Sequence, residues 1–311
     1  MTVERSGAPA TDESLTARSG FSQRLPGSDA GLVAAVVVYF RTPAVLAECL
    51  DGLRTQTRSP DETVVVDNSS ATDGRHERPV AGKDWHWIRA DRNLGFGAAC
   101  NLGAGTTRGE FLLFLNADVV LAPDACEQLR TVAEDHPDVA VVGPRLNGAD
   151  GGVELSARAF PTAVTGLLGR SSWLTRALSA FNVTPAPLAG ALGAGGRVDW
   201  ISGACMLVRR MAFDQVDGFD EGYWMYWEDA DLCRRLTDRG WKVMLWPAAS
   251  GQHKTGSSGR SDQTIEAFHA SAARYYERHV AHTTFAAMFA RALLRARLVL
   301  MLLRHRRRAL S

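Results

Sequence analysis

The sequence predicts an α/β protein built on a doubly wound, mostly parallel β-sheet, and three observations indicate this fold. The run LVAAVVVYF at 32–40 is apolar and rich in β-branched residues, which is typical of a strand covered on both faces. Similar runs recur along the chain, separated by segments with the helical spacing of apolar residues. The chain has 311 residues, 46% of them hydrophobic, and can bury a core without disulfides or structural metals.

The first half of the chain repeats the order strand, helix, strand. After Pro43 apolar residues recur at helical spacing, and ETVVVDNSS then indicates a second strand that ends in a polar turn. The next unit comprises WHWIRA, a glycine-rich helix start in NLGFGAACNLGAG, and EFLLFLNAD. A helix from Pro123 to about Glu134 precedes the strand VAVVGPRL. Because such crossovers are right-handed, we expect these strands to lie parallel in one sheet.

The second half is less regular. Residues 160–197 are rich in Gly, Ala and Pro, so we expect loops and short helices that cover a site. The segment VDWISGACMLVRRMAF indicates a strand that leads into a helix. A further helix is expected from Asp231 to Gly240, and a strand from Lys242 to Trp246 follows it.

Charge is balanced over the whole chain but unevenly distributed. The chain has 35 Lys and Arg against 34 Asp and Glu, a net charge of +1, which argues against a general nucleic-acid-binding protein. From Arg291 onward there are seven arginines and no acidic residue, so the preceding part has 28 basic and 34 acidic groups, a net charge of −6. An acidic body with a basic tail indicates contact with an anionic surface.

Both ends of the chain are expected to lie outside the main domain. Residues 1–30 lack the apolar run of a signal peptide and are expected to form a disordered leader. Residues 281–311 are expected to form a basic amphipathic helix on a membrane surface, since three arginines interrupt the apolar stretch and make a membrane span costly. The alternative is a helix packed on the domain with a solvated basic end. The five cysteines form no metal-binding pattern, which is typical of reduced thiols in the cytosol.

Polar residues follow the predicted strands at the edge where open α/β sheets bind ligands. In chain order, the strand ends contain Tyr39, Arg41, Asp67, Asn93, Asn116 and Asp118. Each of these alone could be a turn former or a helix cap, but together they indicate a ligand site. The side-chain oxygens of Asn116 and Asp118 suit a Mg²⁺ or Mn²⁺ ion that bridges a diphosphate. The motifs GxxxxGK[ST] and GxGxxG are absent from the first strand's end, which argues against P-loop nucleotidases and dinucleotide dehydrogenases.

A second cluster in the sequence, GFDEGYWMYWEDADLCRR, combines acidic and aromatic residues. It contains three neighbouring carboxylates and three aromatic side chains: Glu228, Asp229, Asp231, Trp224, Tyr226 and Trp227. Aromatic faces exclude water and stack on sugars, and a carboxylate beside them is a candidate general base. An acidic helix N-terminus explains one or two of these acids but not the aromatic residues. His253, in a later segment, is a candidate metal ligand, although a lone His is more often a surface residue.

The chain from about Val33 to His253 resembles family 2 glycosyltransferases with the GT-A fold. The resemblance rests on VVVYFRT, VVVDNSS, RNLGFGAACNLG, FLNAD, WISGACMLVRRMAF, GFDEGYWMYWEDADLCRR and the downstream His. It is greatest to the bacterial rhamnosyltransferase branch that builds cell-wall or O-antigen polysaccharide on polyprenyl-diphosphate-linked acceptors. It implies a GT-A domain at 31–280, with a nucleotide-sugar-binding half at 31–147 and an acceptor and catalytic half at 148–280.

The resemblance also implies a role for each motif residue. The expected donor-binding residues are Tyr39, Arg41, Asp67, Asn93, Gly95, Asn116 and Asp118. Among them, Asp67 is expected to contact the nucleotide base. The expected metal ligands are Asp118 and His253, and Asn116 replaces the first acid of the family's DXD motif, so we expect from it a weaker or water-mediated contact. The expected acceptor-binding residues are Trp200, Ser202, Gly203, Trp227 and Glu228, and the expected catalytic base is Asp229.

The implied activity is an inverting, Mg²⁺- or Mn²⁺-dependent transfer of a sugar to a lipid-linked saccharide at the cytoplasmic face of the plasma membrane. Among donors the resemblance favours dTDP-rhamnose, and UDP-sugars remain open. One alternative is a nucleotidyltransferase, which would need a glycine-rich basic loop where this chain has YFRTPAVL. Another is a non-catalytic protein that binds a nucleotide sugar or lipid-linked sugar, and the presence of Asp118, Asp229 and His253 argues against it.

Overall fold

The computed structural model describes residues 29–69, 85–162, 195–254 and 261–309. The leader expected at 1–30 lies, apart from its last two residues, outside these ranges, and so does most of the loop region expected at 160–197.

The described elements alternate between strands and helices over most of the chain. In order they are β1 (Asp29–Tyr39), α1 (Pro43–Arg54), β2 (Glu62–Asp67), β3 (His86–Arg89), α2 (Phe96–Ala104), β4 (Gly109–Asn116), β5 (Val119–Leu121), α3 (Ala125–Asp135), β6 (Val139–Asn147), β7 (Ala157–Arg158), β8 (Gly196–Val198), β9 (Trp200–Ile201), β10 (Cys205–Arg209), α7 (Arg210–Gln215), α8 (Glu228–Asp238), β11 (Lys242–His253), α9 (Asp262–His279) and α10 (Thr284–Ala309).

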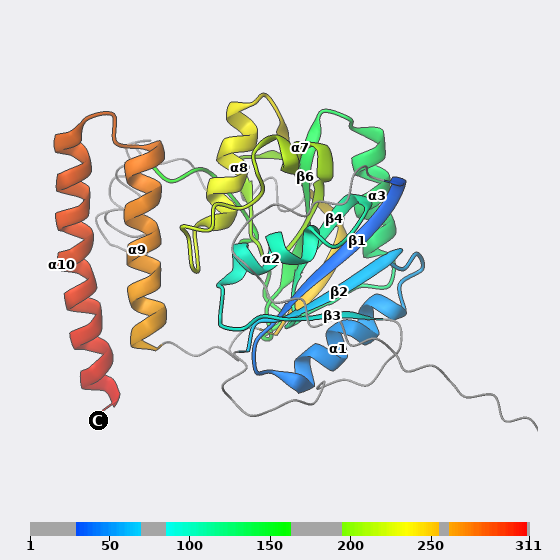
Figure 1. The fold of residues 1–311 in the computed structure, drawn as a ribbon, viewed down its shortest axis with the longest axis horizontal. Coiled ribbons are helices and arrows are strands. Elements are labelled where there is room, and N and C mark those ends of the chain that lie inside the picture. The colour runs from blue at the N-terminus through cyan, green and yellow to red at the C-terminus, as the bar shows by residue number, and fades with distance from the viewer. Residues whose placement is uncertain (1–28, 70–84, 163–194, 255–260, 310–311) are drawn as a thin grey trace, which may run out of the picture.

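One nine-stranded sheet forms the centre of the molecule, in the order β3-β2-β1-β4-β10-β6-β11-β5, with β8 paired to β11. Helices α1 and α3 bury their apolar residues against one face of this sheet (Figure 1). Helices α2, α7 and α8 cover the opposite face. The doubly wound α/β architecture predicted from the sequence is therefore confirmed.

Strand β1 is the central element of this architecture. It pairs in parallel with β2 on one side and with β4 on the other. Ala34 and Val36 enter one core, Ala35 and Val37 enter the other, and all four are fully buried. Because both faces are covered, the stretch from Leu32 to Val38 is apolar at every position rather than at every second one.

The sheet differs from expectation in its later strands. The segment predicted as one strand before a helix forms the short strands β8, β9 and β10, since a turn closed by a hydrogen bond from Cys205 N to Ser202 O interrupts it. β10 lies antiparallel between β4 and β6, so strands from both expected halves of the domain share one sheet. β11 continues past Trp246 to His253, with an irregular register where Pro247 lacks an amide hydrogen. Helix α8 begins at Glu228 rather than at Asp231.

Helices α9 and α10 form a hairpin beside the sheet (Figure 1). Ala290 and Leu294 of α10 are buried in the same core as Tyr275 and Tyr276 of α9. The helix expected in the C-terminal tail is thus present. None of the helices in the described ranges combines the length and the apolar character that a membrane crossing requires.

A buried carboxylate ties α8 to α9. Asp231 is fully buried, accepts a hydrogen bond from Arg235 Nε at 2.6 Å, and lies 2.7 Å from His279 Nε2. Tyr223 Oη donates to the same carboxylate at 3.3 Å. Burial alone would raise the pKa of Asp231, but the hydrogen bonds and charges of His279 and Arg235 outweigh burial and lower it. The ionised form of Asp231 is therefore the one that holds the two helices together.

We expect Asp231→Ala to lower the free energy of unfolding by about 3–5 kcal/mol in urea denaturation, because it leaves buried cationic partners without their carboxylate. The matched control is Asp238→Ala on the same helix, which breaks an exposed ion pair with Arg234 worth about 0–1 kcal/mol. The folded-state pKa of Asp231 is lowered, so its contribution is complete above the ordinary value of 3.8 and is lost as pH falls through the lower folded value. Equal losses in the two variants would contradict this role.

Candidate active site

The ends of the parallel strands bring the predicted donor-binding residues to one edge of the sheet. Tyr39 at the end of β1 lies in register with Asp67 at the end of β2, and Val38 lies in register with Asn116 at the end of β4. Asp67 is buried and lies 3.5 Å from the guanidinium of Arg89 on the neighbouring strand β3. The residues that the sequence predicted to converge at this edge do so in the structure.

The turn after β1 has an unusual backbone conformation. Arg41 adopts a φ of 53°, in the left-handed region, and its amide donates to Ser69 Oγ at 3.2 Å. Its guanidinium lies 5.1 Å from the centroid of the Phe40 ring. Backbone in this region costs on the order of 1–3 kcal/mol and is concentrated at functional sites, which fits a role in donor binding.

Asn68 lies in the polar turn predicted after the second strand, and the sequence analysis gave it no role of its own. It is buried, its Nδ2 donates to Asn93 Oδ1 at 3.0 Å and to Gly95 O at 3.1 Å, and its Oδ1 accepts from Leu94 N at 2.8 Å. One side chain thus holds the whole loop that precedes α2. An Asn after a strand is usually a turn former, and nothing in the sequence indicates a partner 25 residues away.

Gly95 brings the donor side into contact with the aromatic segment. Its φ is +86°, and a Cβ built on it would lie 1.9 Å from Trp224 O, so only glycine fits. The next amide, Phe96 N, donates to the same Trp224 carbonyl at 3.1 Å. Asn93 O accepts from Trp224 Nε1 at 3.4 Å. Two segments far apart in the sequence are therefore joined along their backbones.

Asp118 and His253, the predicted metal ligands, lie together. Strand β5 pairs antiparallel with β11, which places His253 opposite Val119, and Lys254 N donates to Asp118 O at 2.8 Å. His253 Nε2 lies 3.3 Å from Asp118 Oδ1, and His253 Nδ1 lies 2.8 Å from Glu154 Oε2. Burial would lower the pKa of His253, but hydrogen bonds to Asp118 and Glu154 outweigh it and raise the pKa.

Two protein ligands fit a divalent cation that shares its coordination with a diphosphate. Mg²⁺ is commonly held by one or two carboxylates, substrate phosphates and water rather than by a complete protein cage. Across the ranges that the structure describes, no group of three or more His, Cys, Asp or Glu side chains is arranged to hold a metal by itself. The donor set of Asp118 and His253 is therefore consistent with a metal site that a nucleotide completes. The backbone N–H of Asn116 donates a hydrogen bond to Ala204 O at 2.9 Å.

Asp229 and Glu228 stand at the start of α8 in different environments. Asp229 is half-buried, its Oδ2 accepts from Gly203 N at 2.9 Å, and its Oδ1 accepts from Ala230 N at 2.8 Å. Burial raises the pKa of Asp229, while these amide hydrogen bonds oppose the rise. Glu228 is buried, and burial together with the charge of Asp229 raises its pKa well above the ordinary range. The two amide hydrogen bonds favour the ionised form of Asp229, which makes it the better candidate base of the two acids.

Two left-handed residues precede this pair of acids. Tyr226 has a φ of 66° and Trp227 a φ of 70°. Neither is a glycine, so each conformation costs on the order of 1–3 kcal/mol and must be enforced by its surroundings. The Trp227 ring packs against Phe268, Tyr275 and Tyr276 of α9, with centroid distances of 5.7, 5.2 and 6.2 Å. The contacts of the Trp227 ring with these three side chains are those of a core residue. The acceptor-binding role expected for Trp227 stays a prediction.

Of the other predicted acceptor-side residues, Gly203 contacts Asp229, and Trp200 and Ser202 lie just before Gly203 in the chain. Gly203 holds the Asp229 carboxylate, and Ser202 N donates to Ser156 O at 2.7 Å. Trp200 is buried, and its ring lies 5.1 Å from the guanidinium of Arg158 on the partner strand β7. Burial lowers the pKa of Arg158, and the negative charges of Asp229 and Glu154 only partly oppose this. Arg158 therefore interacts electrostatically with the candidate base. Arg158 and Glu154 were not predicted, because they belong to no recognisable motif.

Comparison with known proteins supports the resemblance seen in the sequence. The family description "Glycosyl transferase family 2" matches residues 34–217, and "N-terminal domain of galactosyltransferase" matches residues 194–257. The N-acetylglucosaminyl-diphospho-decaprenol L-rhamnosyltransferase of Mycobacterium tuberculosis is 32% identical over 255 residues, which cover 75% of this chain and 80% of that protein. Rhamnosyltransferase WbbL of Escherichia coli (strain K12) is 30% identical over 153 residues, 49% of this chain and 55% of that protein.

A solved structure shows the same fold. GalNAc-T7, crystallised with UDP, GalNAc and Mn²⁺, superposes with a TM-score of 0.57 at 14% sequence identity, covering 84% of this chain and 53% of that chain. This likeness confirms the GT-A fold. The family match over more than half of the chain favours a glycosyltransferase over the nucleotidyltransferase and non-catalytic alternatives. The protein belongs to glycosyl transferase family 2 and is a glycosyltransferase.

Proposed function

We propose that this glycosyltransferase is inverting and metal-dependent, and that it transfers rhamnose from a dTDP or UDP donor to a polyprenyl-diphosphate-linked saccharide in cell-envelope polysaccharide synthesis. The observation that carries the proposal is a short path of backbone contacts. Asn116 N donates to Ala204 O at 2.9 Å, and the adjacent Gly203 N donates to the Asp229 carboxylate at 2.9 Å. The end of β4, with its DXD-like motif, and the candidate base are therefore held to the same turn.

The donor-side residues support binding of a nucleoside diphosphate. Asp67 at the end of β2 has acceptor oxygens for a base N–H, and Tyr39 and Arg41 lie at the adjacent strand end. The Asn93–Gly95 loop, held by Asn68, borders the same edge. Asp118 and His253 would hold Mg²⁺ or Mn²⁺, which supplies charge neutralisation of the departing diphosphate when bound. The names of the Mycobacterium and Escherichia relatives support rhamnose as the sugar, and the former also supports a decaprenol-linked acceptor.

The environments of the two acids support a single displacement. Asp229 accepts two backbone hydrogen bonds that favour its ionised form, so it can take the proton of an acceptor hydroxyl as that hydroxyl attacks the anomeric carbon. Burial and the charge of Asp229 raise the pKa of Glu228, which disfavours the ionised carboxylate that a nucleophile would need. One attack without a covalent intermediate inverts the configuration at the anomeric carbon.

We expect Asp229→Asn to lower kcat by about 10²- to 10⁴-fold while nucleotide binding stays within twofold of the wild type, because the amide cannot accept the proton. Asp238→Asn, at the exposed end of the same helix, is the control and should keep wild-type activity. The pKa of Asp229 is raised, and the base must be ionised, so kcat of the wild type should fall as pH drops through that value. Near-normal turnover by Asp229→Asn would contradict the assignment.

The donor is tested by calorimetry with dTDP-rhamnose, UDP-galactose, UDP-N-acetylglucosamine and GDP-mannose, each with and without Mn²⁺. We expect metal-dependent binding of one dTDP or UDP donor and its loss in Asp118→Ala, since this variant lacks a carboxylate ligand. Asp135→Ala, at the exposed end of α3, is the control and should bind like the wild type. Metal-independent binding of every donor would refute the metal site, and selective binding of another sugar would refute rhamnose.

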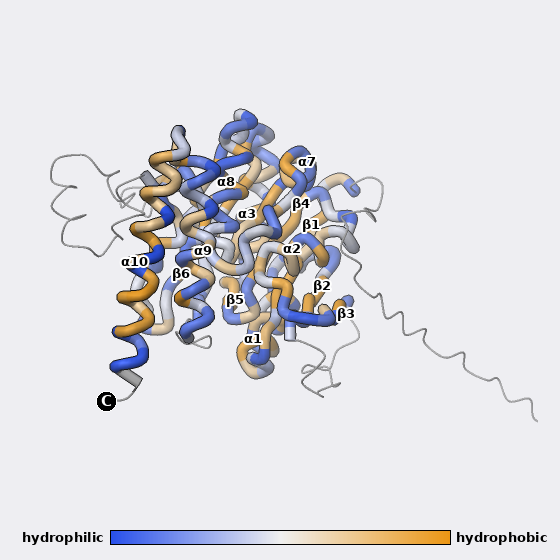
Figure 2. Tube along the Cα trace, turned by 60° about the vertical axis from the view of Figure 1, so that its left-hand side comes forward, coloured by the Kyte–Doolittle hydropathy of each residue, from blue (hydrophilic) through white to orange (hydrophobic). Residues whose placement is uncertain are grey.

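The shape of α10 supports attachment to a membrane at the cytoplasmic face of the plasma membrane. One side of this helix is buried on α9 through Ala290 and Leu294. The outward side exposes a second set of apolar residues: Phe285, Met288, Phe289, Val299, Leu300 and Leu303. Hydrophobic and hydrophilic stretches alternate along α10 in Figure 2. A helix with apolar residues on two opposite sides needs a second partner for the outer one.

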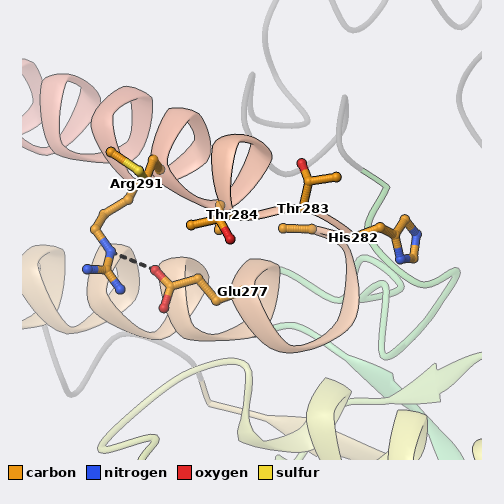
Figure 3. Close-up of a pocket in the computed structure, with 8 residues that line it drawn as sticks. Glu277, His282, Thr283, Thr284 and Arg291 are labelled. Carbon is orange, nitrogen blue, oxygen red and sulfur yellow. Dashed lines mark hydrogen bonds and ion pairs between the residues drawn. The ribbon is translucent and has the colours of Figure 1, made fainter.

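The charge of α10 favours an anionic bilayer as that partner. The helix has no acidic residue and is rich in arginine, and each arginine near an anionic surface contributes about 1 kcal/mol. Where α9 turns into α10, a hollow of about 440 Å³ opens beside this helix, lined by Glu277, Met288 and Arg291 among others (Figure 3). Arg291 Nε donates to Glu277 Oε1 at 2.7 Å across it. The hollow contains none of the predicted site residues.

We expect the full chain to co-sediment with vesicles of phosphatidylglycerol and phosphatidylethanolamine, and the double variant Phe285→Asp, Leu300→Asp to lose at least tenfold in affinity, because it places charge in the inserted face. Met211→Asp is the control, since Met211 is an equally exposed apolar residue on α7. Pure phosphatidylcholine vesicles should bind more weakly. Unchanged binding by the double variant would show that α10 has another partner.

A further inference from the structure

We propose that Glu154 is a positioning residue for His253: it holds the ring proton on Nδ1, so that Nε2 faces the Asp118 carboxylate with its lone pair free to bind a divalent cation. The inference rests on the metal site of the proposed function and adds to it a residue that neither the sequence motifs nor the family resemblance assigned.

The two ring nitrogens of His253 have unequal contacts. Nδ1 lies 2.8 Å from Glu154 Oε2, the length of a charge-assisted hydrogen bond, whereas Nε2 lies 3.3 Å from Asp118 Oδ1. A neutral imidazole has one N–H, and the shorter contact locates it on Nδ1. Nε2 and Asp118 Oδ1 are then two electron-pair donors that face each other. A cation between them would satisfy both, and a carboxylate behind a metal-bound His is the usual means of fixing the ring.

The backbone holds all three side chains in place. Val153 forms an antiparallel bridge with Asn147, and Glu154 N donates to Leu146 O at 2.9 Å, so the turn after β6 folds back on its own strand. β11 pairs with β6 through Gln252 and Asn147, and with β5 through His253 and Val119. Glu154, His253 and Asp118 therefore come from three adjacent segments whose registers leave little freedom, as a preorganised site requires.

The environment argues against a simple surface ion pair. The side chains of His253, Asp118 and Glu154 are 13%, 18% and 29% exposed. An ion pair that only stabilised the fold would need one carboxylate beside the His253 ring. A second carboxylate adds an unfavourable negative charge to a partly buried site. Within the described ranges no Lys or Arg forms an ion pair with Asp118, and the neighbouring Lys254 pairs with Glu48 instead.

The first measurement is the tautomer of His253, from the ¹⁵N shifts of its ring in the metal-free full chain at a pH where the ring is neutral. The resonances are assigned with His253→Gln. We expect the Nδ1–H form in the wild type and a change toward Nε2–H in Glu154→Ala, because Asp118 is then the remaining carboxylate acceptor. Glu154→Gln retains an acceptor oxygen and should keep the wild-type tautomer. An unchanged tautomer in Glu154→Ala would overturn the proposal.

The second measurement is Mn²⁺ affinity in the presence of UDP or dTDP, followed by electron paramagnetic resonance. We expect about 10- to 100-fold weaker binding in Glu154→Ala and a smaller loss in Glu154→Gln. Asp150→Ala is the matched control, since Asp150 caps the same turn by accepting from Gly152 N at 2.9 Å and does not contact His253; it should bind within about twofold of the wild type.

The outcomes separate the two proposals. Wild-type Mn²⁺ binding that Glu154→Ala leaves unchanged would overturn the role of Glu154 and leave the metal site standing. Equal losses in Glu154→Ala and Asp150→Ala would also overturn it, because the effect would then come from the turn. No Mn²⁺ binding by the wild type with either nucleotide would overturn the metal-dependent function itself, and with it the ligation that Glu154 is proposed to support.

Discussion

The contact between the Gly95 backbone and the Trp224 carbonyl is the constraint on which the site depends. It leaves no space for a Cβ, and the amide of Phe96 closes it with a hydrogen bond. A similar contact secures the other end of the same segment, where the Asn101 side chain makes two hydrogen bonds to the backbone of Phe219, each of 2.9 Å. Helix α2 is thus joined, at Phe96 and at Asn101, to the segment that leads into α8. Together with the hydrogen bond from Gly203 N to the Asp229 carboxylate, these contacts join the donor edge to the candidate base.

The start of α8 shows how the surrounding structure enforces a strained geometry. Tyr226 and Trp227 occupy left-handed backbone that isolated residues avoid. The Trp227 ring is enclosed by three aromatic rings of α9, and Asp231 anchors the first turn of α8 to His279. These contacts fix the direction in which Asp229 leaves the helix. Helix α9 is therefore a support of the candidate active site, although none of its residues belongs to the predicted site.

Much of the fold could be predicted from the sequence because the central strands are apolar on both faces. The runs that became β1, β2, β4 and β6 carry that signal without ambiguity. The direction of β10 could not be predicted, since an apolar run reports burial and not orientation. The proximity of Asp118 and His253 came only from the family resemblance, because it depends on the short strand β5, which has no periodic signal of its own. The contacts of Asn68 could not be predicted either, because its hydrogen-bond partner Asn93 lies 25 residues further along the chain.

The position of α10 at one side of the molecule gives the protein an uneven distribution of charge. The seven arginines from Arg291 onward are gathered on this helix and its end, while the rest of the chain has a net charge of −6 (Figure 1). Near an anionic bilayer the two parts experience opposite forces, within the screening length of about 8 Å at physiological salt. Under the membrane attachment proposed above, the basic helix would be drawn toward the bilayer and the net-negative remainder turned away, so charge would orient the protein before the exposed apolar residues of α10 make contact.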